Sequence, residues 1–140
     1  MQKILVIEDE PTLREALKTT FVNNSYEVST AVDGEAGLKL ALEQHPDLIL
    51  LDLRLPKIDG LDVMHQLRDD NWGKDALIII LTNFEPSYSN DDQLEQLNKD
   101  KPTYYLIKSN NTLGNILDKV REVLATRDAV KSEPTPPPQY

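Results

Sequence analysis

The 140-residue sequence contains no cysteine. This absence excludes disulfide bonds, thiolate metal ligands and cysteine nucleophiles. No apolar run reaches the roughly 18 residues that a membrane-spanning helix needs. The N-terminus also lacks the basic segment and long apolar run of a secretory signal. We therefore expect a cytoplasmic protein without a membrane segment.

Basic residues are scarce, because 15 Lys and Arg stand against 24 Asp and Glu, giving a net charge of −9. Binding to a nucleic-acid backbone needs a basic surface, so direct nucleic-acid binding is not expected. An acidic surface suits a metal cation or a partner protein with a basic face. The length fits one domain with one core.

Short apolar runs alternate with longer amphipathic segments along the chain. The runs predict strands at 3–7, 27–32, 47–52, 76–81 and 103–107. The amphipathic segments predict helices at 11–24, 33–45, 59–70, 89–100 and 111–128. The last of these has a clear predicted apolar face, made of Leu113, Ile116, Leu117, Val120, Val123 and Leu124. This alternation indicates the α/β class, with a doubly wound, five-stranded parallel sheet covered on both faces. We expect one domain over 1–128, and a proline-rich disordered tail or truncated linker over 129–140.

Polar residues with reactive or metal-binding side chains lie where the predicted strands end. They are Glu8, Asp9 and Glu10 after the first strand, Asp52 at the end of the third, Thr82 after the fourth and Lys108 after the fifth. Parallel strands end at a common sheet edge, which is where open α/β sheets bind ligands. Each residue also has a structural interpretation alone. Glu10 suits a helix N-cap, and Asp52 suits a turn.

Together, these side chains form a set suited to phosphoryl transfer. Asp9 and Asp52 offer the oxygen ligands that Mg²⁺ prefers. Lys108 can neutralise charge on a phosphoryl group, and the hydroxyl of Thr82 can donate a hydrogen bond to it. The Asp52 carboxylate can itself be the nucleophile and form an aspartyl-phosphate. Phosphoryl transfer depends mainly on positioning and charge neutralisation, and this set provides both.

Four motifs, "VIEDEP", "LILLDLRLPKIDGLDV", "IIILT" and "YYLIK", stand in the order and spacing of a response-regulator receiver domain. The sequence resembles that family over nearly all of residues 2–128. The resemblance implies a flavodoxin-like fold with strand order 2-1-3-4-5 and Mg²⁺, or Mn²⁺, as the metal. It implies a signalling switch rather than an enzyme, phosphorylated by a sensor histidine kinase or a histidine phosphotransfer protein. Such a domain is a monomer or a phosphorylation-induced dimer.

The resemblance assigns the metal and acceptor residues one by one. Asp52 matches the phosphoacceptor, and it shares the metal with Asp9. Glu8 matches the second acid, which acts on the metal through a water molecule. The backbone carbonyl of Arg54 matches a further metal ligand.

The resemblance also implies a conformational switch. Lys108 matches the lysine that contacts the phosphoryl group, and Thr82 matches the hydroxyl that moves toward it. Tyr105 matches the aromatic residue that then turns inward. An aromatic side chain packed in the core is the simpler interpretation, but we favour the switch role, because Thr82 and Lys108 fix the register of Tyr105. The face made by the fourth helix, fifth strand and fifth helix would then change its surface for an output protein that the sequence does not identify.

Two positions depart from the family pattern. Asn83 stands where a small residue usually gives access to the acceptor, and Ser109 stands where a proline usually follows a cis peptide bond. A non-proline cis bond costs about 3 kcal/mol, so we expect a trans bond between Lys108 and Ser109. These departures leave open a degenerate, non-phosphorylated receiver fold that serves as a protein-binding module. A phosphatase is disfavoured, because Arg54 occupies the position at which such enzymes place a second acid.

The remainder of the chain suggests how a signal would leave the domain. The residues after 128 are too few for a core of their own, so we expect no DNA-binding output domain within this chain, unless the chain is cut from a longer regulator. The acidic segment 85–100 is a solvated face or a docking surface for a basic partner.

Two variable positions in this family set the lifetime of the phosphoryl group, and here they hold Arg54 and Phe84. Neither side chain orients water well, and Phe84 would shield the site, so we predict slow autodephosphorylation. Replacing both, with Arg54→Asn and Phe84→Glu, should shorten the phosphoryl lifetime in a decay assay. An unchanged lifetime would contradict the prediction.

Overall fold

The computed structural model describes residues 1–83 and 102–129. The strands are β1 (Lys3–Ile7), β2 (Glu27–Ala31), β3 (Leu48–Leu51), β4 (Ile78–Thr82) and β5 (Tyr104–Ile107). They form one sheet in the order β2-β1-β3-β4-β5, and every neighbouring pair is parallel. The predicted fold class and strand order are therefore confirmed. The helix predicted at 89–100 and most of the predicted tail lie outside the described residues.

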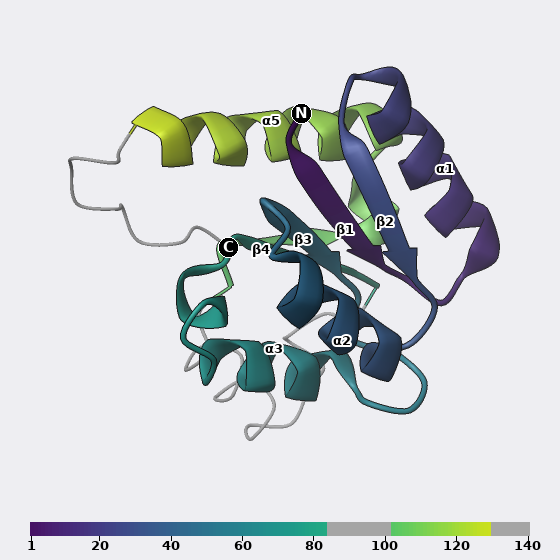
Figure 1. The fold of residues 1–140 in the computed structure, drawn as a ribbon. Helices are drawn as coiled ribbons and strands as arrows, with labels where there is room; N and C mark the ends of the chain where they lie inside the picture. The colour runs from purple at the N-terminus through teal and green to yellow at the C-terminus, as the bar shows by residue number, and fades with distance from the viewer. Residues whose placement is uncertain (84–101, 130–140) are drawn as a thin grey trace.

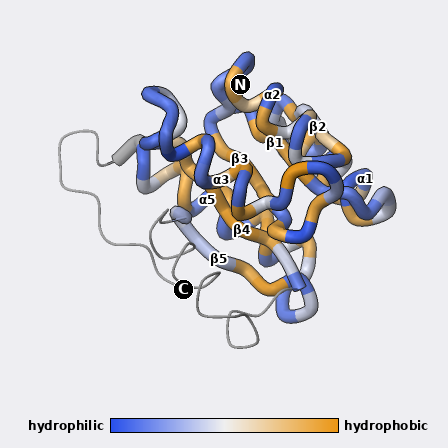
Figure 2. The backbone as a smooth tube through the Cα atoms, turned by 90° about the horizontal axis from the view of Figure 1, so that it is seen from below, coloured by the Kyte–Doolittle hydropathy of each residue, from blue (hydrophilic) through white to orange (hydrophobic). Residues whose placement is uncertain are grey.

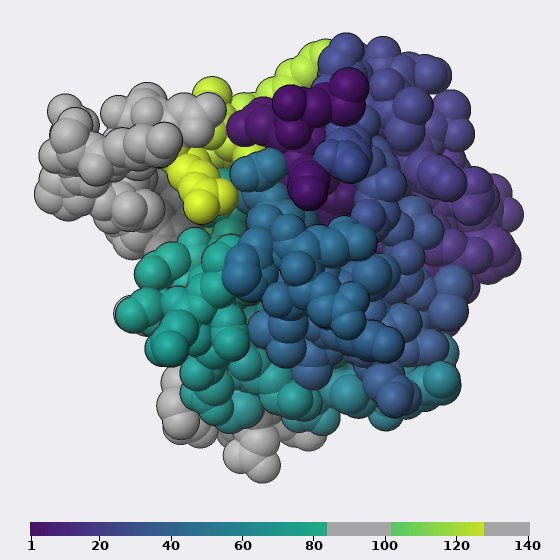
Figure 3. Space-filling view, viewed as in Figure 1, coloured from purple at the N-terminus to yellow at the C-terminus, as the bar shows by residue number. Residues whose placement is uncertain are grey.

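Helices cover both faces of this sheet. They are α1 (Pro11–Asn23), α2 (Gly34–Gln44), α3 (Gly60–Arg68) and α5 (Leu113–Ala129), with short 3-10 turns η1 (Gly73–Asp75) and η3 (Lys108–Asn110). α1 and α5 lie on one face, and α2 and α3 lie on the other (Figure 1). In the space-filling view, α2 and α3 form a continuous surface toward the viewer (Figure 3).

The predicted element ends differ from the observed ones by at most two residues. The largest shift in a strand is at β4, which begins at Ile78 rather than at Ala76. Ala76 instead closes the η1 turn, because its N–H donates to the carbonyl of Gly73 at 3.2 Å. The sequence pattern did not predict this turn.

Successive side chains of each strand point to opposite faces of the sheet, and this alternation divides the apolar core into two clusters. Leu5, Ile49 and Ile80 pack with residues of α2 and α3. Their neighbours Ile4 and Leu50 pack with residues of α1 and α5. Successive strand residues point to opposite faces, so a strand covered on both sides must be apolar at almost every position. The strands accordingly form the hydrophobic centre of the molecule (Figure 2).

One predicted core residue of α5 is wrong. Leu113 is 37% exposed, although its spacing placed it on the apolar face of the last helix. It is the first residue of α5, one turn before the helix begins to contact the core. The remaining predicted residues of that face are buried: Ile116, Leu117, Val120, Val123 and Leu124.

The start of α2 packs directly on the loop that follows β3. The N–H of Gly34 donates to the carbonyl of Pro56 at 3.2 Å. A Cβ atom on Gly34 would lie 1.8 Å from the carbonyl oxygen of Ile58, so any side chain there would collide with backbone. The ammonium of Lys57 also lies 3.6 Å from the carboxylate of Asp33, the N-cap of α2. These contacts hold the loop against α2.

The other end of this loop is equally restricted. Lys57 adopts a left-handed backbone conformation, with φ of 67°, which turns the chain back toward the sheet. The N–H of Gly60 then donates to the carbonyl of Leu53 at 2.9 Å. A Cβ atom on Gly60 would lie 2.1 Å from the carbonyl oxygen of Asp52. The loop therefore leaves the end of β3 and returns to within van der Waals contact of it.

We predict that Gly34→Ala destabilises the protein, because the added methyl group collides with the Ile58 carbonyl. Overpacking of this kind costs about 1–3 kcal/mol in the free energy of unfolding, measurable by urea denaturation. Gly114→Ala is the matched control. Its Cβ atom has only one contact, at 3.7 Å from Thr112, and alanine favours a helix by up to about 1 kcal/mol. Equal stability of the two variants would contradict the prediction.

Candidate functional site

The three consecutive acids after β1 have three different environments. Glu8 is buried, with 2% of its surface exposed, and Asp9 is exposed. Glu10 is the N-cap of α1, and its carboxylate accepts hydrogen bonds from the backbone N–H groups of Thr12 at 3.1 Å and Leu13 at 2.6 Å. The hydrogen bond from Leu13, then that from Thr12, lowers the pKa of Glu10. The N-cap interpretation of Glu10 is therefore confirmed.

Asp52 follows the last residue of β3 and is 5% exposed. Its Oδ1 accepts a hydrogen bond from the backbone N–H of Arg54 at 3.2 Å. Its Oδ2 accepts one from the Lys108 ammonium at 2.8 Å. The turn that the sequence suggested for Asp52 and the charged contact with Lys108 thus coexist on separate oxygens. The Arg54 side chain is exposed, and the role of its carbonyl remains a prediction.

The ammonium of Lys108 connects two strand ends, since it contacts the carboxylates of both Glu8 and Asp52. Burial lowers the pKa of this ammonium, but the hydrogen bonds and charges of Asp52 and Glu8 outweigh burial and raise it. For Glu8, burial is the largest influence and raises the pKa from 4.5 to about 7, with the Asp52 charge adding to it and Lys108 opposing it. The site therefore holds more negative charge than one lysine neutralises.

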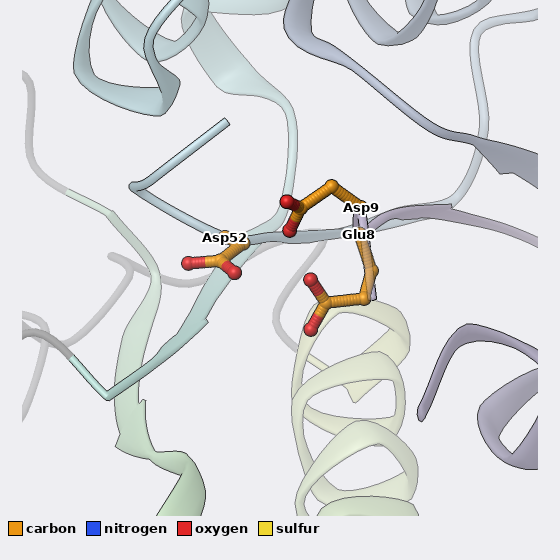
Figure 4. Close-up of side chains that lie close together, drawn as sticks. All are labelled: Glu8, Asp9 and Asp52. Atoms are coloured by element: carbon orange, nitrogen blue, oxygen red, sulfur yellow. The ribbon is translucent and has the colours of Figure 1, made fainter. Parts of the chain in front are cut away.

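Glu8, Asp9 and Asp52 form a candidate cation site. One carboxylate oxygen from each lies within 4.8 Å of the others. Figure 4 shows the three side chains gathered where β1 and β3 end. Three carboxylates are hard oxygen donors, and Mg²⁺ binds such donors while retaining several waters. The residues therefore fit Mg²⁺ or the chemically similar Mn²⁺.

Thr82 and Tyr105 lie on one face of the sheet. Thr82 ends β4 with 1% of its surface exposed, and its register partner in β5 is Ile107. Tyr105 pairs with Ile80, two residues before Thr82, so both side chains belong to the same face. Tyr105 is buried in the core, as its simpler interpretation required, and its switch role remains a prediction.

The positions that depart from the family pattern have mixed outcomes. Asn83 is exposed directly after β4. The described residues contain no cis peptide bond, so the expected trans bond between Lys108 and Ser109 is confirmed. Lys108 begins the η3 turn, and the side-chain amide of Asn111 donates to the carbonyl of Ile107 at 2.9 Å. Phe84 lies outside the described residues.

Sequence reasoning missed Arg14, which reaches the site from the first turns of α1. Its Nη1 donates to the carbonyl of Glu8 at 3.0 Å and to that of Asp9 at 3.2 Å. One feature of the sequence could have indicated this contact. Arg14 has a long cationic side chain and lies four residues after the N-cap, so it can contact the loop that precedes the helix. A single arginine in an exposed helix did not distinguish that role from solvation.

The family is settled by comparison. A profile of the response regulator receiver domain matches residues 4–121. The chain belongs to this family. Four of the six polar residues at the predicted sheet edge form one contiguous cluster in this receiver domain. They are Glu8, Asp9, Asp52 and Lys108.

Curated relatives of this receiver domain are transcriptional regulators. It is 42% identical over 82 residues to the "DNA-binding dual master transcriptional regulator RpaA" of Synechocystis, a match covering 59% of this chain and 34% of the relative. It is 48% identical over 67 residues to the "Alkaline phosphatase synthesis transcriptional regulatory protein PhoP" of Bacillus subtilis, covering 48% of this chain and 28% of the relative. The matches span about a third of the length of these relatives.

Solved structures give the same fold. A CheY-like receiver domain protein from Methanospirillum hungatei has a TM-score of 0.81 at 19% identity, covering 93% of this chain and 98% of that one. The response regulator TrrA from Thermotoga maritima, solved in complex with Mg²⁺-BeF, has a TM-score of 0.72 at 36% identity, covering 88% and 99%. Among the described residues, no helix of this receiver domain is long and apolar enough to cross a membrane.

We predict that the contribution of Glu8 to the stability of the receiver domain is lost as the pH rises toward neutrality without added metal. The folded-state pKa of Glu8, about 7, lies above the ordinary value of 4.5, so the folded state binds the extra proton more tightly. The resulting stabilisation is complete below pH 4.5 and is lost as the pH rises through about 7. We expect this contribution to amount to roughly 1–3 kcal/mol in the free energy of unfolding.

Glu8→Gln is the control for this prediction, because glutamine does not titrate. Urea denaturation between these pH values should show a smaller decrease for the variant than for the wild type. Added Mg²⁺ should restore stability at neutral pH, since a cation that binds only the folded state stabilises it. Identical pH profiles for the two proteins would refute the assignment of the titration to Glu8.

Proposed function

We propose that this receiver domain is a phosphorylation-dependent signalling switch that accepts a phosphoryl group on Asp52. The observation that carries the proposal is the position of the Asp52 carboxylate. It stands at the carboxyl edge of the sheet, 2.8 Å from the Lys108 ammonium and beside the carboxylates of Glu8 and Asp9. A nucleophile, a cation and a set of metal ligands thus occupy one site.

The proposed donor is a phosphohistidine of a sensor histidine kinase or of a histidine phosphotransfer protein. An Asp52 carboxylate oxygen forms a bond to phosphorus as the phosphorus–nitrogen bond breaks. The imidazole leaves with the electron pair and takes up a proton. Lys108 stays beside the acceptor and neutralises charge on the phosphoryl oxygens.

The metal would be held by Asp9 and Asp52, with the Arg54 carbonyl as a further ligand and Glu8 acting through water. When bound, Mg²⁺ would neutralise charge on the phosphoryl oxygens and help to orient them. The three clustered carboxylates support this assignment. The likeness to TrrA, solved with Mg²⁺-BeF, supports it independently.

The output would use the surface made by the predicted fourth helix, β5 and α5. Thr82 would move toward the phosphoryl group, and Tyr105, which is already buried, would hold its inward position behind it. Their placement on one face of neighbouring strands supports this coupling. The partner that binds this surface is not identified, but the acidity of the chain favours a protein over a nucleic acid. The domain would act in the cytoplasm, as a monomer or as a phosphorylation-induced dimer.

Phosphorylation with a small donor tests the proposal. We predict that the protein, incubated with Mg²⁺ and acetyl phosphate, gains one phosphoryl group by intact mass spectrometry. Asp52→Asn should abolish the gain, because an amide is too weak a nucleophile. Asp62→Asn is the matched control, since Asp62 is exposed on α3 and outside the site, and it should be phosphorylated normally.

Two results would contradict the proposed function. Phosphorylation that persists in Asp52→Asn would place the acceptor elsewhere. No mass gain in the wild type would favour the alternative of a non-phosphorylated binding module on the receiver fold.

A further inference from the structure

The side chain of one arginine contacts two successive carbonyl groups of the loop between β1 and α1. The Nη1 atom of Arg14 donates to the carbonyls of Glu8 at 3.0 Å and Asp9 at 3.2 Å. The backbone N–H of the same residue donates to the carbonyl of Glu10 at 3.0 Å. This last contact is the first i to i−4 hydrogen bond of α1 and needs no particular side chain, so the guanidinium contacts the backbone of two of the three acids, Glu8 and Asp9.

The remaining contacts of the loop fix its two ends. The N–H of Glu8 donates to the carbonyl of Ala31 in β2 at 3.0 Å. The side chain of Glu10 is committed to the N-terminus of α1. Between these ends, the Arg14 guanidinium contacts the backbone carbonyls of Glu8 and Asp9. The guanidinium therefore holds the backbone from which these two side chains leave, while the Glu8 carboxylate is also held by the Lys108 ammonium and by the backbone N–H of Glu10 at 3.4 Å.

We infer that Arg14 is a positioning residue of the metal site, acting through the backbone of Glu8 and Asp9 rather than touching the metal. The inference rests on the proposed function, in which these acids hold Mg²⁺. Partners that orient metal ligands contribute strongly to affinity, and their loss typically weakens binding by about 10-fold to 100-fold. A planar guanidinium suits this position, because one nitrogen can face two neighbouring carbonyl oxygens.

Positioning and simple electrostatics predict opposite results at this site. A cation close to a cation site repels the metal, so removal of the Arg14 charge alone would tighten Mg²⁺ binding. Loss of the carbonyl contacts would release the loop and weaken Mg²⁺ binding. The sign of the change in affinity therefore separates the two effects.

The test is calorimetric titration of the full chain with Mg²⁺, without a phosphodonor. We expect Arg14→Gln to bind Mg²⁺ roughly tenfold more weakly than the wild type, and Arg14→Lys to be weakened less, since it keeps the charge and one nitrogen donor but not the planar guanidinium. Lys18→Gln is the matched control, because Lys18 is an exposed cation one turn further along α1. It should stay within about twofold of the wild type.

A second measurement separates positioning from a general structural role. The rate of phosphorylation by acetyl phosphate should fall in Arg14→Gln at low Mg²⁺ and return close to the wild-type rate at saturating Mg²⁺. A rate that saturating Mg²⁺ does not restore would overturn the inference. If thermal melting shows that Arg14→Gln does not fold, the Mg²⁺ titration of Arg14→Lys tests the inference instead. Weaker Mg²⁺ binding than in the wild type would support it, and equal or tighter binding would overturn it.

The outcomes also separate this inference from the proposed function. Mg²⁺ affinity that is equal or tighter in the Arg14 variants, in proteins still phosphorylated on Asp52, overturns the role of Arg14 alone. An equal loss in Lys18→Gln overturns it as well. A wild type that neither binds Mg²⁺ nor accepts a phosphoryl group overturns both.

Discussion

The contact of the Lys108 ammonium with Glu8 and Asp52 is the interaction on which the site depends. Two buried carboxylates in close proximity are unfavourable unless a cation compensates them. The lysine meets this need from β5, across the end of β4, while the acids come from β1 and β3. The order of the strands therefore decides whether the charges can balance. Three clustered carboxylates face one lysine, and this excess of acid gives the site its capacity for a further cation.

The contact residues serve structure and chemistry at once. Asp52 closes the turn through one oxygen and receives Lys108 through the other. Glu10 secures the start of α1, which in turn carries Arg14 back to the loop. The structural and the chemical interpretation of Asp52 compete at the level of the sequence. They are compatible in the folded protein, because each of the two carboxylate oxygens makes one of the contacts.

The fold and the membership of the acid cluster could be predicted because both follow from local patterns. Apolar strands alternating with amphipathic helices imply a covered parallel sheet, and parallel strands bring their ends to one edge. The exposure of Leu113, the left-handed conformation of Lys57 and the contact of Gly34 with Ile58 could not be predicted in this way. Each depends on how closely segments distant in the sequence approach one another, which periodicity does not encode.

The separation of the charged partners along the chain has a consequence for biosynthesis. Asp52 and Lys108 are 56 residues apart, and Lys108 follows the last strand of the sheet. A nascent chain that has formed β1 to β3 already places its acids together, but it has no lysine to oppose them. Contacts of such long range form late, after the intervening segments are ordered. The contact of Lys108 with Glu8 and Asp52 consequently forms only when translation has passed β5.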